Sequence, residues 1–181
     1  MDKEMPRWIL VALAIAFAAL GLMLLDARED LHMYTTYFRE KSPDVSLRIG
    51  ELSSQMDEAA LRQHFEGVPL NCVAETSTLG DRLCYSNIDS ADRRAALALL
   101  AFLNKGRLAH VVVHVPWWKH GAWLRSLKLK YGASQNAGVV GDERGAVLRW
   151  NMDNGYLEMN QSRAFNPLTL STLFWTASPK Q

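Results

Sequence analysis

The chain has little cysteine, little proline and no excess of charge of either sign. Its 181 residues include two cysteines and six prolines, and 20 Lys and Arg balance 19 Asp and Glu. Balanced charge excludes the broad basic surface that charge-driven nucleic-acid binding requires, so we expect no nucleic-acid partner. The sequence also lacks a low-complexity tract and a clear internal repeat.

The motifs of several enzyme classes are absent as well. There is no Rossmann or P-loop glycine pattern, and no serine occupies a G-x-S-x-G turn. Two acidic pairs, Asp89 with Asp92 and Asp142 with Glu143, have the character of solvated loop residues rather than of a catalytic pair. We therefore expect a protein without catalytic activity and without a cofactor.

One long hydrophobic run follows a short tail, residues 1–7. Residues 8–25 contain no charged side chain, and as a helix these 18 residues rise about 27 Å, close to the thickness of the bilayer core. The run predicts a single-pass transmembrane helix. The alternative is a signal peptide cleaved near Ala16-Phe17-Ala18, but the run is longer than a usual signal core and cleavage would leave an apolar end.

The sidedness of this helix is not given by charge, because Lys3 and Arg7 before it are matched by Arg28 and Arg39 after it. The cysteines supply the missing information.

Cys72 and Cys84 lie in two short strand-like arms around a turn near Thr78. A hairpin with this centre sets the two cysteines opposite each other, where a disulfide can form. Disulfides persist in oxidising compartments, so we expect the C-terminal domain in a bacterial periplasm and the helix in the inner membrane. Two reduced, buried thiols in a cytosolic domain are the alternative.

The remaining chain divides into a helical stalk and linker, residues 26–44, a soluble domain, residues 45–177, and a tail, residues 178–181. The stalk is predicted as an amphipathic continuation of the membrane helix, because Leu31, Tyr34 and Phe38 recur at helical spacing. It should end near Pro43.

Within the domain, hydrophobic periodicity and turn residues predict three helices and three hairpins. The helices are expected to run from Ser53 or Ser54 to Gly67, over 117–131 with Trp117, Leu124, Leu127 and Tyr131 on one face, and from Asn166-Pro167 through Phe174. The hairpins are expected at 72–84, 97–115 and 147–159; for the Ala/Leu-rich arm 97–103 the alternative is a helix. This order predicts an α+β fold, an antiparallel sheet with helices packed on one face.

Two clusters could carry a specific activity. His110 and His114 would point to the same face of a strand about 13 Å apart, too far to share one metal ion. With His120 they are the candidates for an alternative function, a periplasmic metal-dependent enzyme or metal-binding protein, although we expect no metal. Trp117, Trp118 and Trp123 with Lys119 form a candidate interaction surface, and the third alternative is an envelope module that binds a ligand there.

A short stretch of the chain resembles a known family. Ile49-Gly50, a helix, Gly67-Val-Pro-Leu70 and strands ending in Asn104-Lys-Gly-Arg-Leu108 are similar to the small α+β modules of the BamE/SmpA family, which support outer-membrane protein assembly. The resemblance covers residues 47–115 and implies a domain that binds proteins. Our leading expectation is a membrane-anchored periplasmic accessory or scaffold subunit whose partners are the bilayer, through residues 8–25, and other proteins of a membrane complex.

Overall fold

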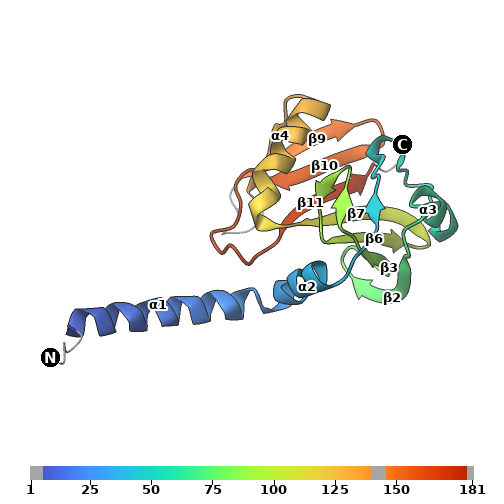
Figure 1. Cartoon of the computed structure of the whole chain (residues 1–181). Coiled ribbons are helices and arrows are strands. Elements are labelled where there is room, and N and C mark those ends of the chain that lie inside the picture. Colours follow the sequence, from blue (N-terminus) through green and yellow to red (C-terminus); the bar gives the residue numbers. More distant parts are fainter. Residues whose placement is uncertain (1–5, 140–145, 179–181) are drawn as a thin grey trace.

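The computed structural model describes residues 6–139 and 146–178, so most of the two predicted tails and Asp142 and Glu143 lie outside it. The fold is α+β, as predicted, with a long apolar N-terminal helix and one large antiparallel sheet (Figure 1). The helices are α1 (Arg7–Asp26), α2 (Arg28–Arg39), α3 (Glu58–His64) and α4 (His120–Tyr131), with 3-10 turns at Ile49–Glu51 and Trp117–Lys119.

The strands are β1 (Asp44–Val45), β2 (Asn71–Ser77), β3 (Gly80–Asn87), β4 (Ser90–Ala91), β5 (Arg94–Ala95), β6 (Ala98–Asn104), β7 (Arg107–Val115), β8 (Gln135–Val139), β9 (Ala146–Met152), β10 (Gly155–Asn160) and β11 (Ser171–Ala177). The large sheet has the order β2-β3-β6-β7-β11-β10-β9-β8, and β1, β4 and β5 form a small separate sheet.

The large sheet consists of two similar halves. The first half is α3 followed by the meander β2-β3-β6-β7, and the second is α4 followed by the meander β8-β9-β10-β11. The last strands of the two meanders, β7 and β11, pair with each other in antiparallel register, with Val111 opposite Trp175. The element order therefore repeats although no repeat is visible in the sequence.

The core lies on one face of this sheet. Along β7, Val111, Val113 and Val115 alternate with His110, Val112 and His114, because successive strand side chains point to opposite faces. The valines of the first set belong to the core, and α3 contributes Leu61 and Phe65 to it while α4 contributes Trp123 and Leu127. Helices α3 and α4 thus cover the same face, as predicted.

All three predicted hairpins are confirmed. Cys72 pairs with Cys84 in β2 and β3, Leu99 with Val113 in β6 and β7, and Trp150 with Leu157 in β9 and β10. Gly155, after the last of these turns, is required by the packing, because a Cβ there would collide with the carbonyl oxygen of Thr176.

The ends of two predicted helices need correction. Helix α3 begins at Glu58, four residues or more after the predicted serine caps, because Asp57 accepts a hydrogen bond from the backbone N–H of Ala60 at 2.9 Å and so caps the helix. Helix α4 begins at His120, three residues after the predicted start, because Trp117–Lys119 form a 3-10 turn. Leu124, Leu127 and Tyr131 of the predicted face do pack on the core, where Trp123 and His120 are buried with them.

The predicted terminal helix is wrong. Residues 171–177 form β11, the strand that joins the two halves of the sheet, with Leu173 and Trp175 in the core. The run of threonine, leucine, phenylalanine and tryptophan has high strand propensity. Asn166 does not begin a helix; its side-chain oxygen accepts from the N–H of Leu168 in a short turn.

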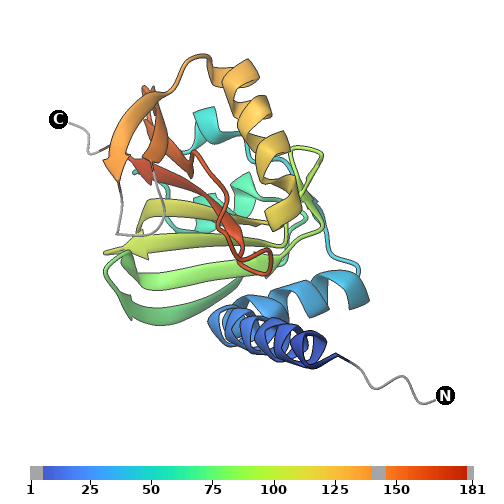
Figure 2. The ribbon, with the colours of Figure 1, turned by 90° about the vertical axis from the view of Figure 1, so that its left-hand side faces the viewer.

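The N-terminal helix is long and apolar enough to cross a membrane and is not buried against the domain; signal sequences share these properties. The predicted amphipathic stalk is helical in α2, but it is not a continuous extension of α1. The helix breaks at Ala27, and α2 turns to pack on the domain with Tyr34 against Leu97 and Leu170 (Figure 2).

Candidate functional site

The three tryptophans predicted as one surface are divided between two environments. Trp123 is 2% exposed in the core, where its ring N–H donates to the carbonyl of Ala95 at 3.0 Å. Trp117 is half-buried and Trp118 is 47% exposed, and both lie where the domain meets α2, with the exposed Lys119 beside them. The predicted surface therefore loses Trp123 and retains the other three residues.

A joint of two parts connects the N-terminal helices to the domain. Its first part is formed by helix α2 with Trp117 and Trp118. The Tyr34 hydroxyl accepts from the backbone N–H of Trp117 at 3.1 Å, and its ring stacks on Trp118 with centroids 5.3 Å apart. Phe38 stacks on the same tryptophan at 6.2 Å. Burial raises the pKa of Tyr34 above its ordinary value of 10.0.

The second part of the joint connects the end of α1 to the loop between β10 and β11. The Asn166 side-chain amide donates to the Met23 carbonyl and to the Asp26 carboxylate, each at 2.9 Å. The Asp30 carboxylate accepts from the N–H of Leu170 at 3.0 Å. Asn166 and Leu170 are both 8% exposed, whereas Asp26 is exposed, so these contacts are partly buried and connect the two parts.

A groove with a volume of about 880 Å³ lies between α4 and the small sheet of β1, β4 and β5. The sequence gives no signal for it, because its walls come from three segments far apart in the chain. Apolar side chains of the core contribute to its lining, among them Leu47, Trp123 and Leu127. Its volume is in the range of ligand-binding sites, and the exposed Leu129 also belongs to the lining.

Charged side chains surround the groove and are largely paired with one another. Asp92 accepts from Lys130 at 3.3 Å and from the backbone N–H of Leu47 at 2.9 Å, and Ser90 donates to Asp44. Asp92 and the neighbouring Arg93 both have positive φ, 47° and 63°, at the tip of the β4–β5 turn. This strained turn positions Asp92 to bridge the small sheet and α4.

The three candidate histidines do not share a site. His110 and His114 lie on the sheet face opposite the core, and His120 lies in α4. The His110 ring contacts the Thr176 hydroxyl at 3.2 Å, and the His120 ring contacts the Ser171 hydroxyl at 3.0 Å. Among the described residues, the groups close enough to share a metal ion are Glu58, Cys72 and Cys84, which do not include a histidine.

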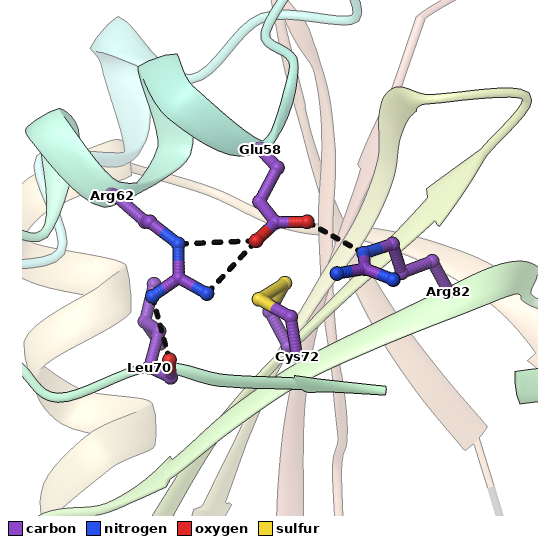
Figure 3. The surroundings of a disulfide bond; sticks show 6 residues. Glu58, Arg62, Leu70, Cys72 and Arg82 are labelled. Atoms are coloured by element: carbon purple, nitrogen blue, oxygen red, sulfur yellow. Dashed lines mark hydrogen bonds and ion pairs between the residues drawn. A yellow bond between two sulfur atoms is a disulfide. The ribbon is translucent and has the colours of Figure 1, made fainter. Parts of the chain in front are cut away.

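Those two cysteines form the predicted disulfide, with Cα atoms 4.0 Å apart, so they offer no thiolate to a metal (Figure 3). Beside it, Glu58 accepts from Arg62 at 2.8 Å and from Arg82 at 2.5 Å. The hydrogen bond from Arg82 is the main cause of the lowered pKa of Glu58. The charged cluster ties α3 to the disulfide hairpin.

Burial lowers the pKa of all three candidate histidines below the ordinary value of 6.5. Asp30 opposes this effect at His114, whereas at His120 the carbonyl of Gln161 opposes it and Arg163 adds to it. The folded chain therefore binds fewer protons at these positions than the unfolded chain does. The contribution of these histidines to stability is present in full above about pH 6.5 and is lost as the pH decreases.

We expect the free energy of unfolding to decrease from pH 7 to pH 5, and to decrease less in a His114→Gln variant. Thermal unfolding followed by circular dichroism at both pH values measures this. His32→Gln is the control, because it makes the same substitution at an exposed histidine. Equal pH dependence in the wild type and in His114→Gln would contradict the role of burial at His114.

No family model, curated protein or solved structure matches the chain. The resemblance to BamE/SmpA modules over residues 47–115 therefore stays a prediction.

Proposed function

We propose that the chain is a single-pass membrane protein whose periplasmic domain is an accessory subunit of a membrane protein complex. Helix α1 is its anchor, and the groove between α4 and the small sheet receives a segment of a partner protein. The observation that carries the proposal is the joint between the N-terminal helices and the domain.

This joint fixes the direction in which the domain presents its surfaces. Tyr34 is 7% exposed between Leu97 and Leu170. Asn166 binds the Met23 carbonyl and the Asp26 carboxylate in the last turn of α1. A module that searches for soluble ligands on a flexible linker does not need such contacts. A subunit that must meet a neighbouring membrane protein at one height and angle needs such contacts, because a fixed geometry lowers the entropy lost on binding.

The groove suits a polypeptide better than a small molecule. Small-molecule sites enclose most of their ligand and direct a few free polar groups toward it. Here the groove is open, and its charges at Asp92, Lys130 and Asp44 are already bonded within the chain. An apolar floor with a polar rim is the usual composition of a protein interface.

The disulfide supports the periplasmic side. A hairpin cross-linked by Cys72 and Cys84 forms and persists in an oxidising compartment, whereas cytosolic reductants keep such thiols reduced. With α1 as an uncleaved anchor, the domain then lies outside the inner membrane.

Two groove substitutions test the proposal. Leu129 is 88% exposed and Arg93 lies on the groove, so Leu129→Asp and Arg93→Glu change its lining without opening the core. After affinity purification of the full-length protein from native membranes in mild detergent, quantitative mass spectrometry should find one stoichiometric membrane partner. We expect about a tenfold lower yield of this partner with either variant.

Val73→Asp is the matched control, because Val73 is also an exposed apolar residue, 43% exposed, but lies on strand β2, outside the groove lining. It should retain the partner. A protein that is always recovered alone, or a partner retained by both groove variants, would overturn the proposal.

A further inference from the structure

The loop formed by residues 161–170 lies beside the last turn of α1. It connects β10 to β11 and projects from the domain on the side toward which α1 extends (Figures 1 and 2). The contact is specific, because Asn166 donates to the Met23 carbonyl and to Asp26. These two hydrogen bonds place the loop at the level of the last turn of α1.

If α1 spans the bilayer, this contact also gives the depth of the loop. The apolar run continues to Leu25, and Met23 precedes it by two residues, which in a helix is a rise of about 3 Å. The Met23 carbonyl then lies at the boundary between acyl chains and headgroups. Asn166, bonded to it, lies at the same depth, and so do its neighbours in the loop.

The exposed side chains of the loop fit that boundary. Phe165 is 90% exposed and extends into solvent, next to the buried Asn166. Arg163 lies over the ring of Trp117 with its guanidinium carbon 3.7 Å from the ring centroid, and the Trp117 ring N–H donates to the Ala164 carbonyl at 2.6 Å. Tryptophan and arginine with apolar neighbours are typical of the interface between membrane and water.

We infer that this loop is a second membrane contact of the domain, in which Phe165 enters the acyl boundary of the bilayer and Arg163 meets lipid phosphates. The partner of this surface is the lipid bilayer, because the loop is hydrogen-bonded to the end of α1, the helix that would span it. The inference rests on the membrane anchoring in the proposed function but concerns a surface distinct from the groove. Anchor and loop together fix the tilt of the domain on the membrane.

Spin labels at single introduced cysteines test this contact in the full-length protein. The native cysteines are joined in the disulfide, so Phe165→Cys, Leu129→Cys and Phe17→Cys each offer one reactive thiol. The proteins are reconstituted into vesicles of phosphatidylethanolamine and phosphatidylglycerol. Collision rates of the label with oxygen, which concentrates in lipid, and with a water-soluble nickel chelate report its depth.

We expect the label at residue 17 to be accessible to oxygen and shielded from nickel, and the label at 129, which is as exposed as 165, to behave as in water. The ratio of oxygen to nickel collisions at residue 165 should shift from the value at 129 toward the value at 17. Vesicles without phosphatidylglycerol should give a smaller shift, because Arg163 then meets less negative charge.

The other outcomes overturn the inference in distinguishable ways. A lipid value at residue 17 with equal, aqueous values at 165 and 129 refutes the loop contact and leaves the anchor and the proposed function intact. An aqueous value at residue 17 refutes the anchor and with it both proposals. Shielding of residue 165 from both collision partners means that protein, not lipid, covers Phe165.

Discussion

Trp175→Ala is expected to lower the free energy of unfolding of the domain by about 3–5 kcal/mol. Trp175 is 1% exposed, and in β11 it pairs with Val111 of β7 on one side and with Leu157 of β10 on the other. It therefore belongs to the seam where the two halves of the sheet meet. Removing its ring leaves a cavity that neither half can close, since both are held in register by their own hairpins.

Denaturant unfolding followed by circular dichroism measures this loss. Trp175→Phe is the first control, because it keeps an aromatic ring in the same position and should cost less than half as much. Thr176→Ala is the second, since Thr176 lies next in the strand on the opposite face and is only half-buried. A cost below about 1 kcal/mol for Trp175→Ala, the size typical of an average substitution, would contradict the position of β11 in the sheet.

Removing the disulfide is expected to cost about 3 kcal/mol, the value for closing a loop of roughly this length in the unfolded chain. Cys72 and Cys84 are separated by 12 residues, and Cys84 is fully buried. The double variant Cys72→Ala with Cys84→Ala should therefore unfold at lower denaturant concentration, and a reductant should destabilise the wild type but leave this variant unchanged.

The matched control for this experiment is Val73→Ala with Leu83→Ala, the next cross-strand pair on the other face of the same hairpin. It removes apolar side chains from the same hairpin but keeps the cross-link, so a reductant should still destabilise it, as it destabilises the wild type.

Alkylation of free thiols in intact cells before lysis tests the compartment of the domain. No free thiol in the membrane-bound protein supports the periplasm, whereas two free thiols would refute the location.

Local patterns predicted the hairpins well. The turn residues around Thr78, Gly106 and Asn154 and the alternation of side chains along the strands act over a few residues, so the sequence contains the information that sets them. The disulfide followed directly, since the register of one hairpin is enough to bring Cys72 opposite Cys84.

The same reasoning failed where distant segments compete. An Asn-Pro pair before Leu170 and Leu173 has the form of a helix start, but the vacant edges of β7 and β10 offer two rows of backbone hydrogen bonds to β11. Similarly, no local residue breaks the helix at Ala27. The break is stabilised by Tyr34 packing on Leu97 and by Asn166 binding at Met23.

The candidate surfaces were predictable only in part. The exposed Trp118 and its neighbour Trp117 were found from residue type, and Trp123 was grouped with them as part of the same aromatic stretch. On α4, Trp123 instead faces the core together with Leu127. The groove could not be found at all, because Asp44, Asp92 and Lys130 meet only after folding.

By itself, the sequence determined the apolar helix, the three hairpins, the disulfide and the α+β class, since each depends on periodicity or turn chemistry within a short segment. The tertiary structure alone decided that two similar halves join through β7 and β11, that α2 docks on the domain, and that a groove and a loop beside α1 result. These features depend on the burial of apolar side chains from segments far apart in the chain, as where Tyr34 packs against Leu170. Such burial is a property of the whole folded chain, so no short window of the sequence contains it.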